Sequence, residues 1–463
     1  WHYDLSWGYG HNRVGYRTLN SYNTSFGAAS VRNFDSGAMA YGQHSVNLDL
    51  QHDLSVRFAQ NVSLAFGGEY RHENYQITPG EYQSYAVGPL AAAYGVGGGA
   101  QGFPGFAPRT ATDASRHSVA GYVELDTDFT EAFSVQIAGR YEDYSDFGDR
   151  LSGKIASRLA LTDWLSLRGS ASTGFRAPSL QQQHYTATST NLVNVGGVNQ
   201  FIDVGTFAVS DPVARALGAK DLKAEKSTNF GGGLTLTPVR GLSVTADYYN
   251  IKIRDRVVYS ENLQGPDVVA LLNAAGFRGL TSARFFVNGI DTRTQGVEVV
   301  GTYRLPEFGL GNVQLTAGYN YNETKIIDRA VLPSLPGLTL FGRQESLRFE
   351  RGQPRSKVNL AVDIDRGIFG ATLRTNRYGK VLAAGSSPAL DVELEPKWIT
   401  DLELRVRPGR FELAIGANNL FDVYPTALPQ TPSFASSFYL PYSSFSPFGF
   451  NGRYLYARGA VNF

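Results

Sequence analysis

The stretch 401–418, DLELRVRPGRFELAIGAN, contains two short segments of alternating polarity joined by a Pro-Gly turn. Apolar side chains stand at every second position from Leu402 to Val406, with charged residues between them. The alternation resumes from Phe411 to Ala417. A period of two predicts β-strands that have one apolar and one polar face. This stretch is therefore predicted to form two neighbouring strands joined by a tight turn.

The same period recurs along the chain and predicts sixteen strands. The connections between them alternate between a few residues, as in TEA, TDW and RPG, and long loops such as 177–226 and 420–451. Tight turns at one end and long loops at the other are typical of a transmembrane antiparallel β-barrel, an all-β fold. The predicted strands lie near 2–15, 43–54, 62–76, 117–129, 132–144, 151–161, 165–176, 227–237, 242–257, 283–304, 312–325, 356–365, 368–379, 397–407, 410–419 and 452–463.

Aromatic residues near the strand ends favour the same fold. Outer-membrane barrels carry a girdle of amphipathic rings at each membrane interface, although aromatic residues are enriched in strands of every kind. The residues expected in these girdles are Trp164, Trp398, Tyr141, Tyr144, Tyr303 and Tyr378.

The composition excludes several other classes of protein. The hydrophobic fraction is 42%, and no window approaches the ~18 consecutive apolar residues that a spanning helix needs. A net charge of +1 gives no basic field, so nucleic acid is not a predicted partner. The chain has no Cys, which excludes disulfides and thiolate metal sites. A soluble β-propeller would repeat every ~40–50 residues, and no such repeat is present.

The polar strand faces carry enough charge to line a wet or plugged lumen. Asp363 and Asp365 are two residues apart, so both side chains point to one face of a strand. Calcium would require six to eight oxygen ligands, so we predict lumen lining and no metal site. The remaining charges expected inside the barrel include Asp401, Glu403, Arg405 and Arg407.

Two short helices are predicted within the long loops. In 264–277, QGPDVVALLNAAGF, Pro266 suits the first turn of a helix and Gly276 suits its C-terminal end. The segment 210–222, SDPVARALGAKDL, has a similar pattern. The long strand 283–304 contains Gly289 and Gly296 as expected bend or bulge sites.

Several stretches, in this order and spacing, resemble TonB-dependent outer-membrane receptors over about 290 residues. They are STGFRAPSLQQ (172–182), LKAEKSTNFGGGLTL (222–236), VTADYYNIKIRDRV (244–257), TRTQGVEVVGTYRL (292–305), GYNYNETKI (318–326), GANNLFDVYP (416–425) and the terminal Phe463. Alternating hydrophobics before a final aromatic resemble the signal by which such barrels are recognised for assembly.

The resemblance implies a barrel of 22 strands with an N-terminal plug, driven by TonB and the proton motive force. The sixteen predicted strands correspond to the last sixteen, so we interpret 1–463 as one barrel portion that lacks the plug and about six strands. It also implies the outer membrane of a Gram-negative bacterium. The implied partners are outer-membrane lipid and lipopolysaccharide, the barrel assembly machinery, the TonB complex acting through the plug, and a small-molecule ligand.

Active transport of a scarce, bulky solute is the implied function, with an iron–siderophore complex favoured and haem, cobalamin or carbohydrate left open. No cofactor and no catalytic residue is predicted. His184 follows the FRAP stretch in a long loop, as a haem-ligating His does in some members of this family, although FRAP also occurs in members that do not transport haem. The aromatic loop 420–451 suits either ligand capture or packing on itself or on lipopolysaccharide. Expected substrate contacts are Arg176, His184, Tyr185, Phe438, Tyr439 and Tyr442.

Two alternatives from other classes remain. A complete sixteen-stranded barrel could act as a diffusive porin, because a closed barrel of that size leaves an aqueous channel. An outer-membrane enzyme would need a Ser/His or Asp/His constellation at one level of the barrel. The sequence does not provide one.

Overall fold

A computed structural model describes residues 1–195, 198–277, 280–306, 309, 311–331, 339–431, 434 and 440–461. Every predicted strand is present in it, with its bounds moved by a few residues at most ends and by about nine at the start of one strand. The strands of the wall are β1 (His2–Thr18), β2 (Phe34–Leu54), β3 (Asn61–Thr78), β4 (Thr112–Thr130), β5 (Phe133–Tyr144), β6 (Gly148–Thr162), β7 (Leu165–Arg176), β10 (Glu225–Leu236), β11 (Leu242–Tyr259), β13 (Ser282–Arg304), β14 (Asn312–Arg329), β15 (Ser356–Arg366), β16 (Phe369–Tyr378), β19 (Lys397–Val406), β20 (Phe411–Asn418) and β21 (Tyr454–Val461).

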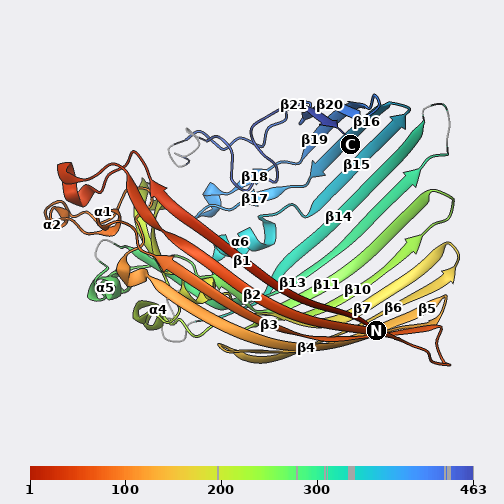
Figure 1. Cartoon of the computed structure of the whole chain (residues 1–463). Helices are drawn as coiled ribbons and strands as arrows, with labels where there is room; N and C mark the ends of the chain where they lie inside the picture. The colour runs from red at the N-terminus through yellow and green to blue at the C-terminus, as the bar shows by residue number, and fades with distance from the viewer. Residues whose placement is uncertain are drawn as a thin grey trace.

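These strands form one curved antiparallel sheet in chain order. Each pairs with the next, and the pairings β7 with β10, β11 with β13 and β16 with β19 pass over the intervening loop strands. Within the described residues no pairing joins β1 to β21, and Figure 1 shows these two strands on opposite sides of an opening onto the inner wall. These strands therefore do not form the closed sixteen-stranded barrel that the porin alternative requires.

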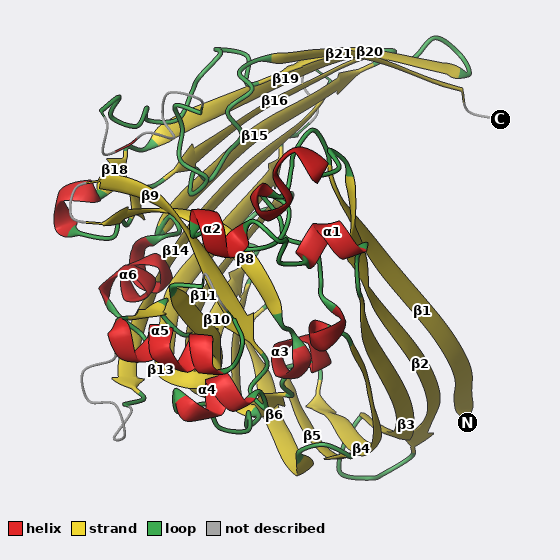
Figure 2. Cartoon of the chain, turned by 90° about the vertical axis from the view of Figure 1, so that its left-hand side faces the viewer, coloured by secondary structure: helices red, strands yellow, loops and turns green. Residues whose placement is uncertain are grey.

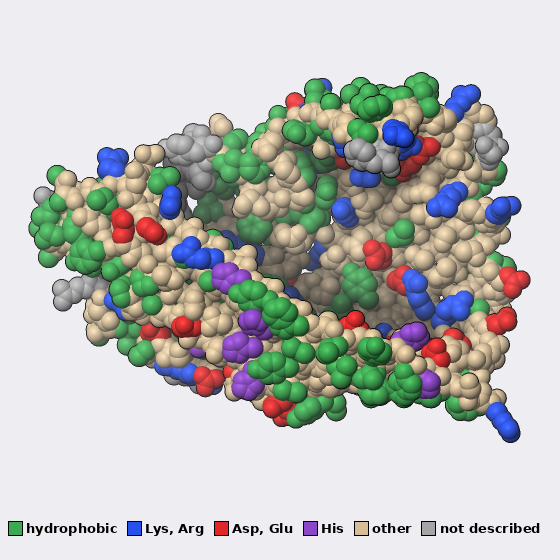
Figure 3. All heavy atoms as spheres, in the orientation of Figure 1, with side chains coloured by type: hydrophobic (Ala, Val, Ile, Leu, Met, Phe, Trp, Pro, Cys, Tyr) green, Lys and Arg blue, Asp and Glu red, His purple; other side chains and the backbone are tan. Residues whose placement is uncertain are grey.

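The two faces of the sheet follow the predicted alternation. Leu455 on β21 is 70% exposed on the outer face. Its neighbour Tyr456 points inward, where its hydroxyl donates a hydrogen bond to Glu403 at 2.9 Å. Figure 3 shows acidic and basic side chains over the hollow inner wall and hydrophobic side chains along β1 at the near edge. Hydrophobic side chains on the outside and charge on the inside suit a wall between lipid and water.

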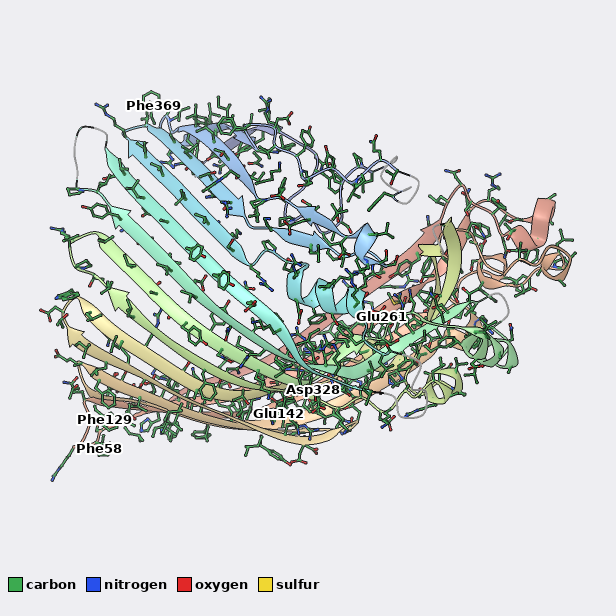
Figure 4. All side chains as sticks on the ribbon, turned by 180° about the vertical axis from the view of Figure 1, so that it is seen from behind. Phe58, Phe129, Glu142, Glu261, Asp328 and Phe369 are labelled. Atoms are coloured by element: carbon green, nitrogen blue, oxygen red, sulfur yellow. The ribbon has the colours of Figure 1, made fainter. Side chains whose placement is uncertain are left out.

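Aromatic side chains mark the short-turn end of the wall. Figure 4 shows Phe58, Phe129 and Phe369 at this end, whereas Glu261 lies at the end with the long loops.

Two tyrosines that were expected in an outer girdle instead point inward. Tyr144 is buried against Phe147 and Phe175, and Tyr378 stacks on Phe448 with ring centroids 5.9 Å apart. That expectation was wrong because a position at a strand end does not determine which face of the sheet a residue occupies.

One of the two predicted bend sites in β13 is confirmed, because Arg256 and Val257 pair with Ile290 and Asn288 and leave Gly289 between them as a bulge. Two further irregularities were not predicted. The register shifts between Asp291 and Thr292, opposite Asp255, whose φ of 54° marks a bulge in β11. The side chain of Asp291 accepts a hydrogen bond from the Asp255 amide at 2.9 Å and stabilises the bulge. Gly296 provides room instead, because a Cβ there would lie 2.5 Å from the Tyr249 ring.

The long loops contain their own secondary structure. Both predicted helices are confirmed, as α4 (Pro212–Ala216) and α5 (Pro266–Ala274). A hairpin of β8 (Ala187–Val195) and β9 (Val198–Phe207) was not predicted. The other loop elements are η1 (Thr24–Ala29), α1 (Tyr82–Tyr85), α2 (Ala91–Tyr94), η2 (Pro108–Thr110), α3 (Leu180–His184), β12 (Leu263–Gln264), α6 (Arg343–Arg351), β17 (Val381–Ala383), η3 (Pro388–Leu390) and β18 (Val392–Leu394).

The largest hydrophobic core lies among these loops and not inside the wall. Residues from three separate loops and from the loop end of β13 bury one another there, and Figure 2 shows α4, α5 and α6 gathered at this end. The core includes Phe207, Leu217, Leu272, Phe285 and Leu340. Burial of this kind ties loops that are distant in sequence into one body. Among the described residues, no helix is long and apolar enough to cross a bilayer.

Candidate functional site

The loop end of the wall, here called the mouth, begins with an anchored FRAP segment. Arg116 on β4 is buried and lies where 175–178 leaves β7. Its Nε donates to Glu73 at 2.5 Å, and its Nη1 donates to the carbonyl of Pro178 at 2.6 Å. Glu73 also accepts a hydrogen bond from the Tyr41 hydroxyl. A buried guanidinium that donates both to a carboxylate and to a backbone carbonyl fixes the path of the loop.

Helix α3 follows directly and carries His184 at its last position. Ser179 and Gln182 form a capping box that satisfies the first amides of the helix. Gln183 then donates to Asp146 at 2.8 Å, which ties the helix to the short β5–β6 connection. Burial lowers the pKa of His184, and the nearby Asp146 opposes that shift. The imidazole is therefore neutral at neutral pH.

Arg176, at the end of β7, faces Glu225 at the start of β10. Two guanidinium nitrogens donate to the carboxylate, one of them at 3.0 Å. Glu225 is buried and also accepts the amide of Val257 at 2.8 Å. The predicted substrate contact Arg176 thus already has a bidentate partner that holds three wall strands in register.

Tyr185 belongs to an aromatic cluster on the inner wall. Its ring meets Phe106 edge to face at 6.4 Å, beside Tyr75 and Leu180. Burial raises the pKa of Tyr185 to about 12. The hydroxyl therefore stays protonated and can donate a hydrogen bond at any physiological pH.

The aromatic loop 420–451 packs partly on itself. Tyr442 stacks between Tyr424 and Phe450, with centroids 5.8 and 6.1 Å away, and forms a β-bridge with Ala427. Of the two roles expected for this loop, the geometry favours self-packing for Tyr442. The other predicted contacts in this loop, Phe438 and Tyr439, lie outside the described residues, as does Phe463.

Four arginines at the mouth, namely Arg109, Arg150, Arg256 and Arg284, lie over aromatic rings and form no ion pair with any described residue; for Arg150 the ring is that of Phe147, at 5.5 Å. The guanidinium carbon of Arg109 is 3.9 Å from the Phe277 centroid, and burial lowers the Arg109 pKa. The corresponding distances are 4.9 Å for Arg256 over Phe349 and 4.9 Å for Arg284 over Tyr259. The mouth therefore brings aromatic surface together with cations that are not held in ion pairs.

Charges farther down the inner wall are largely paired with one another. Arg407 bridges Asp365 and Glu412, at 2.9 Å each. Asp363 accepts from Thr372 at 2.6 Å, so the two predicted carboxylates have separate partners. Across the described part of the chain, no group of three His, Cys, Asp or Glu side chains could hold a metal ion.

Comparison with known proteins fits this geometry. A family model described as "TonB dependent receptor-like, beta-barrel" matches residues 1–420. The chain belongs to this family. It is a β-barrel of the outer membrane, and its family is one of receptors and not of enzymes. No curated protein sequence matches the chain significantly.

Solved structures with similar folds include receptors for siderophores and their iron complexes. The siderophore receptor PirA from Acinetobacter baumannii is 13% identical with a TM-score of 0.62, over 99% of this chain and 60% of that one. A mutant ferric enterobactin receptor from Pseudomonas aeruginosa in complex with enterobactin is 15% identical, with a TM-score of 0.61 over 99% and 59%. The ferripyoverdine receptor of P. aeruginosa is 14% identical, with a TM-score of 0.55 over 91% and 50%. At these identities the likeness concerns the fold, and the chain spans about half to three fifths of each structure.

The ring-stacked arginines and the Arg116 anchor of this TonB-dependent receptor barrel were not predicted from the sequence. Glu73 and Arg116 are direct partners across β3 and β4. Opposite charges on two adjacent predicted strands were a usable signal, but the register was not known. The arginines stacked on Phe277, Phe349 and Tyr259 gave no signal, because each of these rings comes from a segment distant in sequence.

Proposed function

We propose that this chain forms the barrel wall of a TonB-dependent receptor that takes up a ferric siderophore, with the plug and first strands lying outside residues 1–463. The family assignment supports the receptor class. The structural relatives are described as siderophore, ferric enterobactin and ferripyoverdine receptors, which supports the substrate class. Transport would depend on the TonB complex acting through the plug.

The observation that carries the substrate class is a set of three of the ring-stacked arginines, Arg109, Arg256 and Arg284. Siderophores bind Fe³⁺ through deprotonated oxygens, so many of their complexes are anionic, and the catecholates are also aromatic. Such a ligand is recognised by guanidinium groups that present both charge and a planar face. Cations without an ion-pair partner attract an anion more strongly than paired ones.

The substrate contacts predicted from the sequence have different roles in this proposal. His184 and Tyr442 are proposed to contact the solute, and Phe438 and Tyr439 stay predicted contacts. Arg176 and Tyr185 are proposed to support the site, since both already pack against neighbouring side chains. Phe463 stays a predicted assembly signal.

The test is iron-limited growth and uptake of radiolabelled iron in a strain that lacks the gene. The full-length gene should restore uptake of one class of ferric siderophore, and only in the presence of TonB. The variant with Arg109→Gln, Arg256→Gln and Arg284→Gln should bind that siderophore at least about tenfold more weakly, because it lacks three guanidinium charges. Arg240→Gln, a change in a short turn, is the matched control and should bind normally.

Other growth phenotypes would contradict the siderophore assignment. Restoration by haem alone, together with its abolition in His184→Ala, would instead support the haem alternative. Uptake of cobalamin or of a carbohydrate with no effect of the three arginine changes would exclude an anionic iron chelate as the ligand.

A further inference from the structure

Histidine side chains are concentrated on one part of the wall, the strands β1–β4. The strand register makes three of them direct neighbours, because His44 on β2 is paired with His72 on β3, and His72 is paired with His117 on β4. His11 on β1 lies diagonally beside His44, since its own direct partner is Gly42. Figure 3 shows histidine side chains gathered along this part of the wall. We call His44, His72 and His117 the histidine row.

The histidine row belongs to the outer face of the wall. Successive side chains of a strand point to opposite faces, so residues two positions apart share a face. Each member of the row lies two positions from an exposed residue of its own strand on the outer face. His44 and His117 are themselves exposed, and His72 is partly exposed. The exposed outer residues beside the row are Val46, Tyr70 and Val119.

The height of the histidine row is just on the water side of the lipid boundary. One step toward the short turns, the outer face carries Trp7 and Tyr70, which both flank Val46. Tryptophan and tyrosine rings gather at the membrane–water interface. On the other side of the row, toward the long loops, Asn74 donates a hydrogen bond to Asp113 at 2.7 Å, so the surface there is polar. A dissolved ion can therefore reach the row from the water.

The imidazoles of the row are available to a ligand. Among the described residues, the side chains of His72 and His117 have no ion-pair or hydrogen-bond partner. The ring of His44 stacks on Tyr9, with centroids 4.5 Å apart. Directly opposite residues of two strands have Cβ atoms about 4.5–5.5 Å apart, so two imidazoles can turn toward one ion and bind it at about 2.0–2.1 Å. Imidazole nitrogen is a preferred ligand of Ni²⁺, Cu²⁺ and Zn²⁺.

We propose that the histidine row binds one divalent transition-metal ion, of the class of Ni²⁺, Cu²⁺ and Zn²⁺, between His72 and either flanking histidine. Among the described residues, no group of three His, Cys, Asp or Glu side chains could hold a metal ion, so the wall supplies two ligands and water completes the coordination. His72 takes part in both arrangements, whereas His44 and His117 alternate. A bound ion joins β3 to a neighbouring strand and stabilises the folded wall, because the unfolded chain does not hold the two imidazoles together.

The test uses the receptor from its full-length gene, purified in detergent, with Cu²⁺ as the probe. Electron paramagnetic resonance reports the nitrogen atoms bound to this ion, and an equilibrium titration gives its affinity. Loss of an outer-shell partner already weakens metal binding by roughly 10–100-fold. His72→Gln removes a direct ligand of both arrangements, so it should weaken Cu²⁺ binding at least about tenfold and remove the signal of two bound nitrogens.

The flanking histidines test the sharing of His72. His44→Gln alone or His117→Gln alone should weaken Cu²⁺ binding only about twofold, because one pair of imidazoles remains. The two changes together should weaken binding as much as His72→Gln does. The matched control is His52→Gln, on the same face of β2, because His52 is paired with Leu64 and stacks on Trp1. This variant should bind Cu²⁺ normally.

Two further measurements separate metal binding from misfolding and from substrate uptake. Heat-modifiable migration should show that every variant is folded. Uptake of ferric siderophore should be normal in His72→Gln, because the histidine row is on the outer face and the proposed solute site is reached through the mouth. Failure of the one proposal is therefore distinguishable from failure of the other.

Zn²⁺ gives a second readout of the same site. It should slow hydrogen exchange of 38–46, 70–78 and 112–119 in the unaltered receptor and not in His72→Gln. Equal affinity for Cu²⁺ in His72→Gln and in the unaltered receptor would overturn the proposal. A Cu²⁺ spectrum that is unchanged when both flanking histidines are replaced would also overturn it.

Discussion

At the scale of single residues, adjacent positions of β21 face opposite sides of the wall and should therefore tolerate different side chains. Leu455 faces outward, six residues or about 20 Å along the strand from Val461, which places it near the middle of the lipid band. Leu455→Arg should cost about 2–4 kcal/mol there. Tyr456→Arg points inward, where Glu403 can accept the new cation, and should cost less.

The measurement is the amount of heat-modifiable, folded barrel in outer-membrane fractions for each variant of the full-length gene. Leu455→Arg should reduce this amount more than Tyr456→Arg does. The opposite order would mean that the faces of β21 are exchanged and that the register with β20 is wrong.

The ion pair between Arg176 and Glu225 is a second test at this scale. Glu225 is buried, with only 7% of its side chain exposed. Its negative charge is therefore stabilised by the hydrogen bonds from Arg176 and from the Val257 amide. Arg176→Ala should weaken the local structure by about 1.5–3 kcal/mol, the usual value of hydrogen bonds to a charged group. Hydrogen exchange of 177–224 should accelerate accordingly.

The matched control is Arg215→Ala, which removes a surface pair with Asp221. Asp221 is 87% exposed, and exposed pairs contribute about 0–1 kcal/mol. Hydrogen exchange in the same loop should therefore hardly change. Equal acceleration in the two variants would show that the Arg176 pair does not hold the loop.

At the scale of elements, Glu261 couples the β11–β12 connection to α6. Its carboxylate accepts the amide of Gly342 at 3.1 Å. Burial raises the Glu261 pKa, and the nearby Glu345 raises it further. Because this pKa is higher in the folded protein than in the unfolded chain, the carboxyl contributes stability at low pH that is lost as pH rises through the raised value.

Glu261→Gln keeps the acceptor oxygen and removes the charge. The contact between α6 and this connection should then be more stable than in the unaltered protein at neutral pH, and its pH dependence should flatten. Hydrogen exchange of 339–351 at several pH values measures both effects. If the variant retained the pH dependence of the unaltered protein, another group would have to titrate there.

The element scale also shows what a sequence can and cannot predict. All strands of the wall were predicted, because each carries its own alternation, and α5 was predicted from Pro266 and Gly276. The β8–β9 hairpin was missed, although the sequence TNLVNVGGVNQFI carries a usable hairpin signal, a Gly-Gly pair between two runs that contain apolar residues. The bulge at Gly289 in β13 was predicted, whereas the bulge at Asp255 in β11 was not.

The candidate site was less predictable than the wall for a physical reason. FRAP and His184 were found from sequence because they are local motifs. The pairs of Arg109 with Phe277 and of Arg256 with Phe349 bring together segments that are distant in sequence and that pack in two different hydrophobic clusters. Contacts of this kind depend on register and loop packing, which no local period encodes.

At the scale of the whole molecule, the orientation of the wall can be tested with single cysteines, since the chain contains none. Ser386 lies in a long connection and Arg410 in the short turn between β19 and β20, and both are exposed. Long loops lie outside the cell and short turns in the periplasm. A membrane-impermeant maleimide applied to intact cells should therefore label Ser386→Cys and not Arg410→Cys, whereas both should react after the outer membrane is disrupted. Labelling of Arg410→Cys alone in intact cells would invert the topology, and the mouth would then face the periplasm.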